Sequence, residues 1–482
     1  MRYQSATPQI NKGPIFICGC KVKILFIVKS VCLPVFVYLP LNLFYMKNKP
    51  LNTFRISRFI NEEAYGGIIL IIATIIALGW ANSAYYESYH HIWHELKVGF
   101  AWGDINMITS LHHWINDGLM ALFFFTVGLE IKREIMGGEL STIKKASMPI
   151  AAAIGGMIIP AVLYTLVAIN NPEYIKGWGI PMATDIAFAL GLLALLGDRV
   201  NISLKIFLTA LAIADDLGAV MVIAVFYTES IDYSELLSGG FFIAVLIVAN
   251  YAGVRRTVFY AIIGFIGVWL AFVFSGVHAT IAGVLIALTI PARTKIGEEE
   301  YVQKLSKILN RFKKVEPNDI SLLSKEQAHL IANIEDLNDK AQTPLQKLEH
   351  AMHPITAFFI LPVFALSNAG VHIEGSIMEM ILHPISLGII AGLVLGKFLG
   401  ISLLSHLMVM FKLSTLPKGI TWKQIYGVAF LAGIGFTMSM FISDLAFDSE
   451  GYKQIAKVGI MAASFISATI GMLILGWGTK KP

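Results

Sequence analysis

Charged residues are scarce in this chain. Only 14% of its 482 residues are Asp, Glu, Lys or Arg, whereas 56% are hydrophobic, and soluble domains usually carry about 25% charge. This deficit excludes an ordinary soluble domain and predicts segments that lie in lipid. Basic residues exceed acidic ones by only 37 to 32, too small an excess to suggest a nucleic-acid partner. The sequence therefore predicts an integral membrane protein.

Cysteine is nearly absent. The three cysteines all lie in the first 45 positions, at Cys18, Cys20 and Cys32. No disulfide framework is therefore expected beyond them. This N-terminal stretch resembles a poor signal peptide, because lysines precede a proline-interrupted apolar run. We favour the alternative that Met46 opens a basic leader. Residues 1–45 would then be a doubtful extension from an upstream start codon, and residues 46–482 the membrane domain.

Twelve hydrophobic runs are long enough to cross a bilayer, which takes about 20 residues per helix. They lie at residues 64–82, 115–131, 147–169, 179–197, 204–228, 237–254, 257–275, 276–291, 353–371, 384–409, 425–447 and 455–477. Lys and Arg are concentrated in alternate loops, and cytoplasmic loops hold the basic residues. The sequence thus predicts an all-α membrane protein with twelve transmembrane helices. Both termini and the long polar loop 292–350 would be cytoplasmic.

Four charged residues lie where lipid is expected. Asp215 and Asp216 are at the centre of span five, Lys397 is at the midpoint of span ten, and Asp185 follows Thr184 in span four. Each such charge costs about 2.5 to 3.5 kcal/mol on the insertion scale. One alternative is a structural ion pair between an Asp and Lys397. That pair would still leave at least one carboxylate over.

The adjacent aspartates favour ion chemistry. Neighbouring residues on an α-helix point about 100° apart, so Asp215 and Asp216 can serve different partners. Two carboxylates with a nearby hydroxyl and backbone carbonyls form a hard site for a small alkali cation. The same carboxylates can also bind protons. We therefore expect Asp215 and Asp216 to bind both the cation and protons, and we expect no cofactor.

Spans four and eleven both contain helix-breaking residues. Pro181 and Asp185 interrupt span four, and Gly433 and Gly435 precede Thr437 in span eleven. They are the middle members of spans 3–5 and 10–12. Corresponding interrupted helices in two inverted-topology repeats indicate an ion site at the membrane midplane. Ordinary small-residue helix packing is the alternative for the glycines.

Several segments resemble the bacterial sodium/proton antiporters of the NhaA type, over about Phe59 to Gly478. They read HHWINDGLMALFFFTVGLEIKREI, GIPMATDIAFALGLLALLGDRV, KIFLTALAIADDLGA, SGVHATIAGV, GIIAGLVLGKFLGISL and GIGFTMSMFISDLAF. The link between interrupted helices and a midplane ion site is known partly from such antiporters, so it does not support the resemblance independently. The resemblance implies exchange of Na⁺, and of Li⁺, for H⁺. Two carboxylates and a lysine can trade more than one proton per cation, which predicts electrogenic exchange serving Na⁺ and pH homeostasis.

The resemblance also implies roles for the midplane residues. Asp216 and Asp215 would carry the cation and protons, and Lys397 would alternate between pairing with an Asp and releasing it. Thr184 and Asp185 would stand where the extended chains of spans four and eleven cross. There Asp185 would offset the helix N-termini and Lys397 the C-termini.

A pH-responsive cytoplasmic region is a further implication of the resemblance. Its candidates are Glu130, Arg133, Glu134, Glu349, His350 and His353, with His278 on the far side of the membrane. Histidine titrates in the relevant range, although a lone His is more often a satisfied interfacial residue. Asp117, near the opposite mouth, fits either an exit route or an interfacial cap.

The chain departs from the family pattern in three places: the long insertion before Glu349, residues 1–45, and Asp444, where an uncharged residue is expected. We expect Asp444, near the end of span eleven, to reach water. Two other functions remain open, a proton-coupled carrier of a small organic solute and an intramembrane aspartyl protease. The protease is disfavoured because the obvious carboxylates are adjacent, so no enzyme is expected. The sequence leaves the oligomer open, with a homodimer as one candidate.

Overall fold

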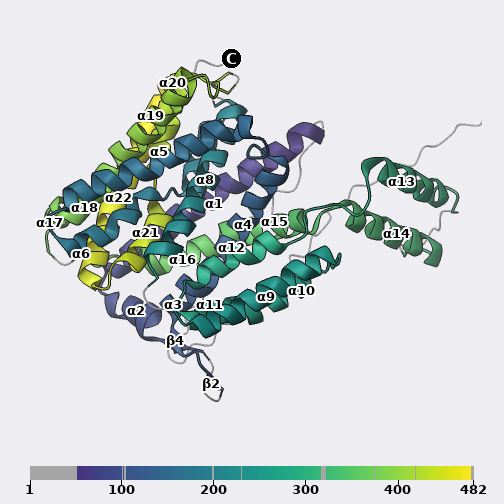
Figure 1. The fold of residues 1–482 in the computed structure, drawn as a ribbon, viewed down its shortest axis with the longest axis horizontal. Coiled ribbons are helices and arrows are strands. Elements are labelled where there is room, and N and C mark those ends of the chain that lie inside the picture. Colours follow the sequence, from purple (N-terminus) through teal and green to yellow (C-terminus); the bar gives the residue numbers. More distant parts are fainter. Residues whose placement is uncertain are drawn as a thin grey trace, which may run out of the picture. The chain divides into compact units, whose positions relative to one another are not determined.

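Helices make up most of the structure, a computed structural model (Figure 1). It describes residues 51–99, 101–102, 105–197, 200–228, 231–315, 322–373, 375–417 and 419–478. The expected extension at 1–45 lies outside the described residues. Residues Asn52–Pro482 form one compact unit.

Eight helical segments in the described ranges are long and apolar enough to cross a membrane. They are Leu111–Gly137, Ile143–Ala168 (α5), Ile202–Phe226 (α8), Tyr233–Tyr251 (α9), Thr257–Ser275, Pro344–Asn368, Pro384–Met410 and Glu450–Gly476, the last within α22 (Glu450–Gly478). Four contain a π-helical stretch, so their parts are α3 (Leu111–His113), η2 (Trp114–Leu119) and α4 (Met120–Gly137); α10 (Thr257–Ile262), η5 (Ile263–Trp269) and α11 (Leu270–Ser275); α15 (Pro344–Ile355), η6 (Thr356–Ile360) and α16 (Leu361–Asn368); α18 (Pro384–Ile390), η7 (Ala391–Gly396) and α19 (Lys397–Met410). The protein is therefore an α-helical, multi-pass membrane protein.

Two further apolar helix pairs are sharply bent at a short break. In the first, α6 (Pro172–Ile175) and the 3-10 helix η3 (Lys176–Met182) are followed by α7 (Ile186–Leu195), with a bend of 45°. In the second, α20 (Trp422–Leu431) is followed by α21 (Phe436–Ala446), with a bend of 46°. Two shorter apolar helices, Tyr65–Ala81 within α1 (Leu51–Ala81) and α12 (Ala279–Thr289), complete the apolar set in these ranges.

Close packing of α5 against α19 positions Lys397. A Cβ on Gly155 would lie 2.2 Å from the Gly400 carbonyl oxygen, and one on Gly400 would lie 2.0 Å from the Gly155 carbonyl oxygen. Only glycine permits this approach of two helix backbones. Lys397 begins α19 about one turn before Gly400, and the π-helical stretch η7 directly precedes it. π-Bulges occur frequently at functional sites.

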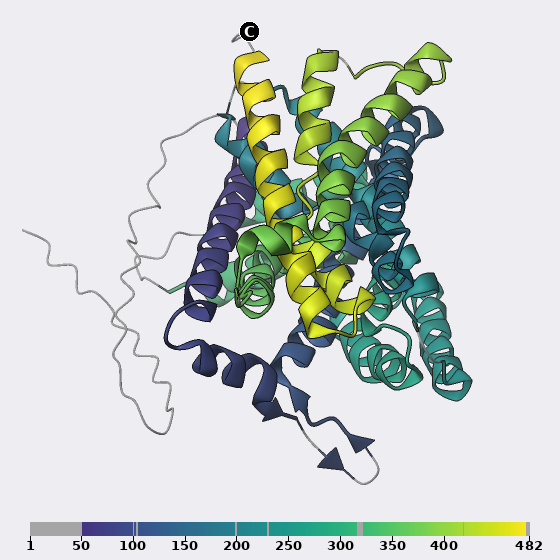
Figure 2. The ribbon, with the colours of Figure 1, turned by 90° about the vertical axis from the view of Figure 1, so that its left-hand side faces the viewer.

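Short elements occupy the connections. Figure 2 shows the small strands at one end of the helices, where β1 (Lys97–Val98) pairs with β4 (Thr109–Ser110) and β2 (Ala101–Trp102) with β3 (Ile105–Asn106), both antiparallel. The all-α expectation omitted these two-residue strands, which are too short to show a sequence period. The other short helices are α2 (Tyr86–His90), η1 (His91–Glu95) and α17 (Ile377–Leu382).

The long insertion 292–350 contains two helices before α15 begins. They are α13 (Glu298–Phe312) and α14 (Lys325–Ala341), which pack on each other (Figure 1). Ser324 starts α14 with a reciprocal capping box to Gln327, which satisfies two otherwise orphaned N–H groups. Arg255 donates to the Arg293 carbonyl at 2.6 Å and to the Gln342 carbonyl at 3.0 Å. These bonds tie both ends of the insertion to the loop before α10.

Candidate functional site

The two bent pairs meet at their breaks. The backbone N–H of Asp185 donates to the Ile434 carbonyl oxygen at 2.7 Å, which joins the two non-helical segments directly. Gly433 allows the second break to pack closely against η7 and α22, because a Cβ there would lie 2.3 Å from the Leu393 carbonyl oxygen and 2.7 Å from Ser467 Oγ. The break in each pair frees backbone groups that can be satisfied only inside the protein. The two breaks therefore stabilise one another.

Asp185 is bonded to the start of both half-helices that follow the breaks. Its Oδ1 accepts from the Phe188 N–H at 2.9 Å, as the N-cap of α7. Its Oδ2 accepts from the Thr437 N–H at 3.0 Å and from Thr437 Oγ1 at 2.5 Å. A carboxylate is favourable here, because helix N-termini carry partial positive charge.

Asp215 and Lys397 form a fully buried ion pair beside this crossing. Lys397 Nζ lies 2.5 Å from Asp215 Oδ2, and both side chains are 0% exposed. The ammonium also donates to the Met182 carbonyl at the end of η3. Thr184 Oγ1 lies 2.7 Å from the same Asp215 oxygen and 2.8 Å from the Ala432 carbonyl oxygen. Helix C-termini favour a cation, so the lysine lies where the backbone attracts it.

Asp216 lacks such partners. It is fully buried, and within the described residues neither of its carboxylate oxygens has a hydrogen-bond partner. It lines a cavity of about 80 Å³ together with Asp185 and Thr437, a volume sufficient for several water molecules. Buried polar atoms are nearly always bonded in native proteins. Asp216 is therefore a candidate binding group, because its carboxylate has no protein partner in the described residues and lines a cavity.

The charges at the crossing do not balance. Three buried carboxylates, Asp185, Asp215 and Asp216, share one ammonium, that of Lys397. Burying an ion costs several kcal/mol unless it is paired, so a proton or a monovalent cation is needed to neutralise the surplus. Carboxylate, hydroxyl and carbonyl oxygens suit a hard cation. Across the described ranges, no group of three or more His, Cys, Asp and Glu side chains is placed to hold a metal ion.

An ion-pair cluster links α4 to α15. Arg133 Nη2 lies 2.9 Å from Glu134 Oε1, and Arg133 Nη1 pairs with Glu349 Oε1. Glu349 is buried, whereas the neighbouring His350 is exposed. The structure thus brings together four of the residues expected to respond to pH.

The remaining cytoplasmic candidates lie on the Asp216 cavity. Glu130 and His353 line it, as does Arg133. One cavity therefore connects the ion-pair cluster to Asp216. Charges that share a buried cavity are poorly screened from one another.

His278 and Asp117 lie apart from this cavity. His278 Nε2 lies 2.8 Å from the Tyr227 carbonyl oxygen. Asp117 pairs with His113 at 3.0 Å and, with Trp114 and Trp269, lines a separate cavity of about 70 Å³.

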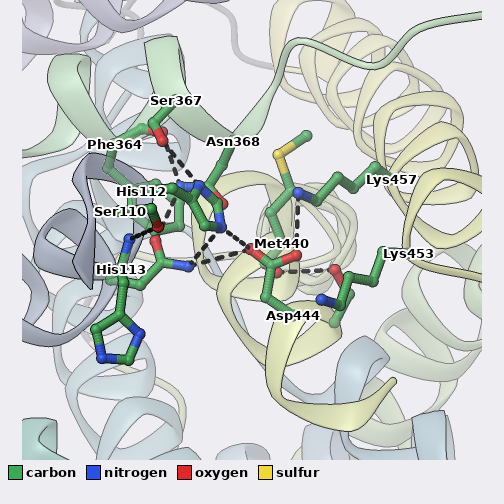
Figure 3. A network of polar contacts seen from close by, with 12 residues as sticks. Ser110, His112, His113, Phe364, Ser367, Asn368, Met440, Asp444, Lys453 and Lys457 are labelled. Atoms are coloured by element: carbon green, nitrogen blue, oxygen red, sulfur yellow. Dashed lines mark hydrogen bonds and ion pairs between the residues drawn. The ribbon is translucent and has the colours of Figure 1, made fainter. Parts of the chain in front are cut away.

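The expectation that Asp444 reaches water is wrong. Its side chain is only 7% exposed, and its Oδ1 lies 3.0 Å from Lys457 Nζ. Figure 3 shows Asp444 between Lys457 and the side chains of His112 and Asn368. His112 Nε2 lies 3.7 Å from Asp444 Oδ2. The sequence position near a helix end did not reveal that α22 supplies a lysine to this carboxylate.

Neutral groups complete this Asp444 cluster, defined by Asp444, Lys457, His112, Asn116 and Asn368. The Asn116 amide donates to Asp444 Oδ2 at 3.3 Å and lies 3.2 Å from His112 Nε2. The Asn368 amide donates to Asn116 Oδ1 at 3.0 Å. Burial, and then the positive charge of Lys457, lowers the pKa of His94, whose ring centroid lies 4.6 Å from that of His112.

Sequence reasoning missed several residues at these sites. Thr126, Thr209 and Thr356 line the Asp216 cavity, and Thr126 Oγ1 lies 3.1 Å from Thr356 Oγ1. Isolated hydroxyls within apolar runs were the available signal. Lys457 lay inside the predicted span 455–477 and was not recognised as a buried charge.

The helices and the buried carboxylates define a multi-pass membrane protein with charged groups in its interior. The family model described as Na+/H+ antiporter 1 matches residues 57–475. The chain is 49% identical to the Na(+)/H(+) antiporter NhaA of Oleidesulfovibrio alaskensis, over 87% of this chain and 92% of that protein. It is 51% identical to NhaA 1 of Psychromonas ingrahamii, over 86% and 95%, and 47% identical to NhaA of Helicobacter pylori, over 87% and 94%. The chain belongs to the Na⁺/H⁺ antiporter family and is a transporter, not an enzyme.

Proposed function

We propose that this protein expels Na⁺, and Li⁺, in exchange for a larger number of entering H⁺. The observation that carries the proposal is the buried, unbonded Asp216 carboxylate on a cavity, next to the Asp215–Lys397 pair. A carboxylate in this state gains most from binding either a proton or a small cation. Competition between the two for the same oxygens is the basis of exchange.

In the proposed cycle, Na⁺ binds Asp216 and Asp215 and displaces Lys397 from Asp215. Thr184 already lies 2.7 Å from Asp215 and can follow its reorientation. Asp185 remains bonded to the two helix N-termini and holds the crossing together. Two protons leave on cation binding, one from an Asp and one from the other Asp or from Lys397. Each turnover then moves one net positive charge inward.

In this proposal the protein has twelve membrane spans. The eight long helices, the two bent pairs and the two shorter apolar helices coincide with the twelve predicted runs. Spans 3–5 are α5, the pair containing η3 and α7, and α8; spans 10–12 are the α18–α19 segment, the pair of α20 and α21, and α22. Each set places a bent pair between two long helices, which supports an inverted repeat with crossing interrupted helices.

We also propose an inner-membrane protein with cytoplasmic termini, on the basis of the basic loops. Residues 46–482 would be the antiporter domain and 292–350 a cytoplasmic loop. The ion-pair cluster around Arg133, which lies on the Asp216 cavity, would sense cytoplasmic pH. The titrating residues would be Glu130, Glu134, Glu349, His350 and His353. His278 would act separately at the opposite face, and Asp117 would line the exit route.

The test is reconstitution into liposomes with a pH-sensitive dye. At equal pH on both sides, K⁺ and valinomycin set the potential and Na⁺ movement is recorded. An inside-negative potential should drive Na⁺ out, because each charge is worth about 2.3 kcal/mol per 100 mV, enough for a gradient of roughly 50-fold. A rate of Na⁺ movement that does not change with the membrane potential would contradict electrogenic exchange. Proton flux evoked by an organic solute instead of Na⁺ would contradict the antiporter itself.

A further inference from the structure

A second cavity, of about 390 Å³, lies between the first turns of α5 and α8 and the segment that follows α19. Four kinds of side chain line it. The lysines are Lys144, Lys145 and Lys412, and the hydroxyl residues are Ser203, Ser414 and Thr415. The other lining residues are apolar, apart from one acid, Glu139. None of these residues takes part in the proposed ion cycle.

The lining carries surplus positive charge. Lys145 is 3.9 Å from Glu139, which is a weak, half-exposed pair. Lys144 and Lys412 have no acidic partner within 4.0 Å among the residues that the structure describes. The cavity is therefore lined by three lysines and a single carboxylate, that of Glu139.

Local backbone structure strengthens the positive potential. The first turns of α5 and α8 contain no acidic residue, although helix N-termini favour acids over lysines. Lys144 and Lys145 stand in the first turn of α5, where they oppose the helix dipole. Lys412 has φ of 58° and is the one non-glycine residue with positive φ in the described ranges. That left-handed conformation is unfavourable for a residue with a Cβ.

The cavity is also apolar on one side. Met148, Phe207 and Ala210 form buried parts of its wall. Large apolar side chains around it are exposed, with Ile143 at 89% and Leu413 at 63%. In a membrane protein such side chains face lipid. The cavity thus joins a basic, hydroxyl-lined part to an apolar surface.

We propose that this basic cavity binds the phosphate of an anionic phospholipid headgroup, with the acyl chains lying along the adjacent apolar surface. Lysines, serine and threonine hydroxyls and helix N-termini are groups that bind phosphate oxygens. Basic pockets between helices on the cytoplasmic side are suited to anionic headgroups. Free phosphate shares the headgroup chemistry but gains nothing from the apolar surface. The inference rests on the membrane location and on the proposed cytoplasmic side of this cavity, and it is independent of ion exchange.

The experiment measures lipid binding to the purified full-length protein in detergent by native mass spectrometry. Phosphatidylglycerol, phosphatidylcholine and inorganic phosphate are titrated separately. The test variant is Lys144→Gln/Lys145→Gln/Lys412→Gln. The matched control, Lys304→Gln/Lys307→Gln/Lys313→Gln, removes the same charge from α13 and the residue after it.

We expect the test variant to bind phosphatidylglycerol at least tenfold more weakly than wild type, while the control variant binds it equally well. Phosphatidylcholine should bind weakly and similarly to all three proteins. Equal phosphatidylglycerol affinity in the test variant and wild type would overturn the site. Inorganic phosphate binding as tightly as the lipid would overturn the lipid assignment. If the triple variant does not fold, Lys412→Gln alone should weaken phosphatidylglycerol binding about threefold, and no change would overturn the proposal.

Discussion

Two buried Asp–Lys pairs in this protein differ in the charges that surround them. Asp444 pairs with Lys457 at 3.0 Å within a cluster whose other members are neutral amides and an imidazole. Asp215 pairs with Lys397 at 2.5 Å, but two more carboxylates, Asp185 and Asp216, share its surroundings. One cluster balances its charges, and the other has an excess of negative charge.

From this difference we propose that the Asp444–Lys457 pair is structural and that the Asp215–Lys397 pair takes part in transport. A buried pair whose charges balance can hold helices together, but it has no excess charge to attract another ion. At the crossing, the Asp216 oxygens have no bonding partner within the described residues and face a cavity. The surplus carboxylate is therefore more informative than burial or the presence of a lysine. Four experiments, each with its own control, test the two clusters.

The largest effect is expected from Asp216→Asn. An amide can neither neutralise a cation nor exchange a proton, so Na⁺-dependent proton flux in liposomes should fall to background. The matched variant Asp444→Asn should retain at least half of the flux when normalised to inserted protein. The comparison fails if Asp216→Asn keeps more than a tenth of the flux, or if Asp444→Asn is equally inactive.

Lys397→Ala should affect both stability and transport. It leaves Asp215 buried without its cation, and removing one partner of a buried pair costs about 3–5 kcal/mol. We expect a midpoint of thermal unfolding several degrees lower and an altered pH profile of exchange. Lys397→Arg is the control that keeps the charge. A Lys397→Ala protein as stable as wild type would show that the pair contributes little.

Lys457→Met should lower stability without changing the pH profile of exchange. The Asp444 carboxylate would lose its counter-ion, whereas the double variant Asp444→Asn/Lys457→Met removes both charges and should recover most of the loss, as replacement of a whole buried pair often does. Thermal unfolding of wild type, both single variants and the double variant completes the cycle. Additive losses would contradict the pair, and a shifted pH profile would give it a transport role.

The smallest effect concerns His94. Because burial and Lys457 lower its pKa, the unfolded chain binds more protons than the folded chain as pH falls through about 6.5. Stability should therefore decrease on acidification from pH 8 to 5. His94→Gln should flatten this decrease, whereas His329→Gln, at an exposed position on α14, should not. Unfolding midpoints measured across this range check the prediction, and identical slopes in all three proteins would refute it.

Sequence alone determined the membrane class, the approximate places of the apolar helices and the charged residues at the crossing. These are properties of composition and helical length, because a charge inside an apolar run is costly wherever that run packs. Asp185, Asp215, Asp216 and Lys397 were therefore identifiable one by one. The family resemblance supplied their expected roles.

Only the tertiary structure decided which of these charges are partners. Asp215 and Lys397 are 182 residues apart, and no pattern within either helix reveals that Asp215 takes the lysine while Asp216 has no partner in the described residues. The same holds for Asp444, whose burial depends on groups supplied by α3, η2 and α22. Helix packing also decides that Thr126, Thr209 and Thr356 line the Asp216 cavity. Ionic partnership over long sequence distances is set by helix packing, which a linear reading of hydrophobicity does not contain.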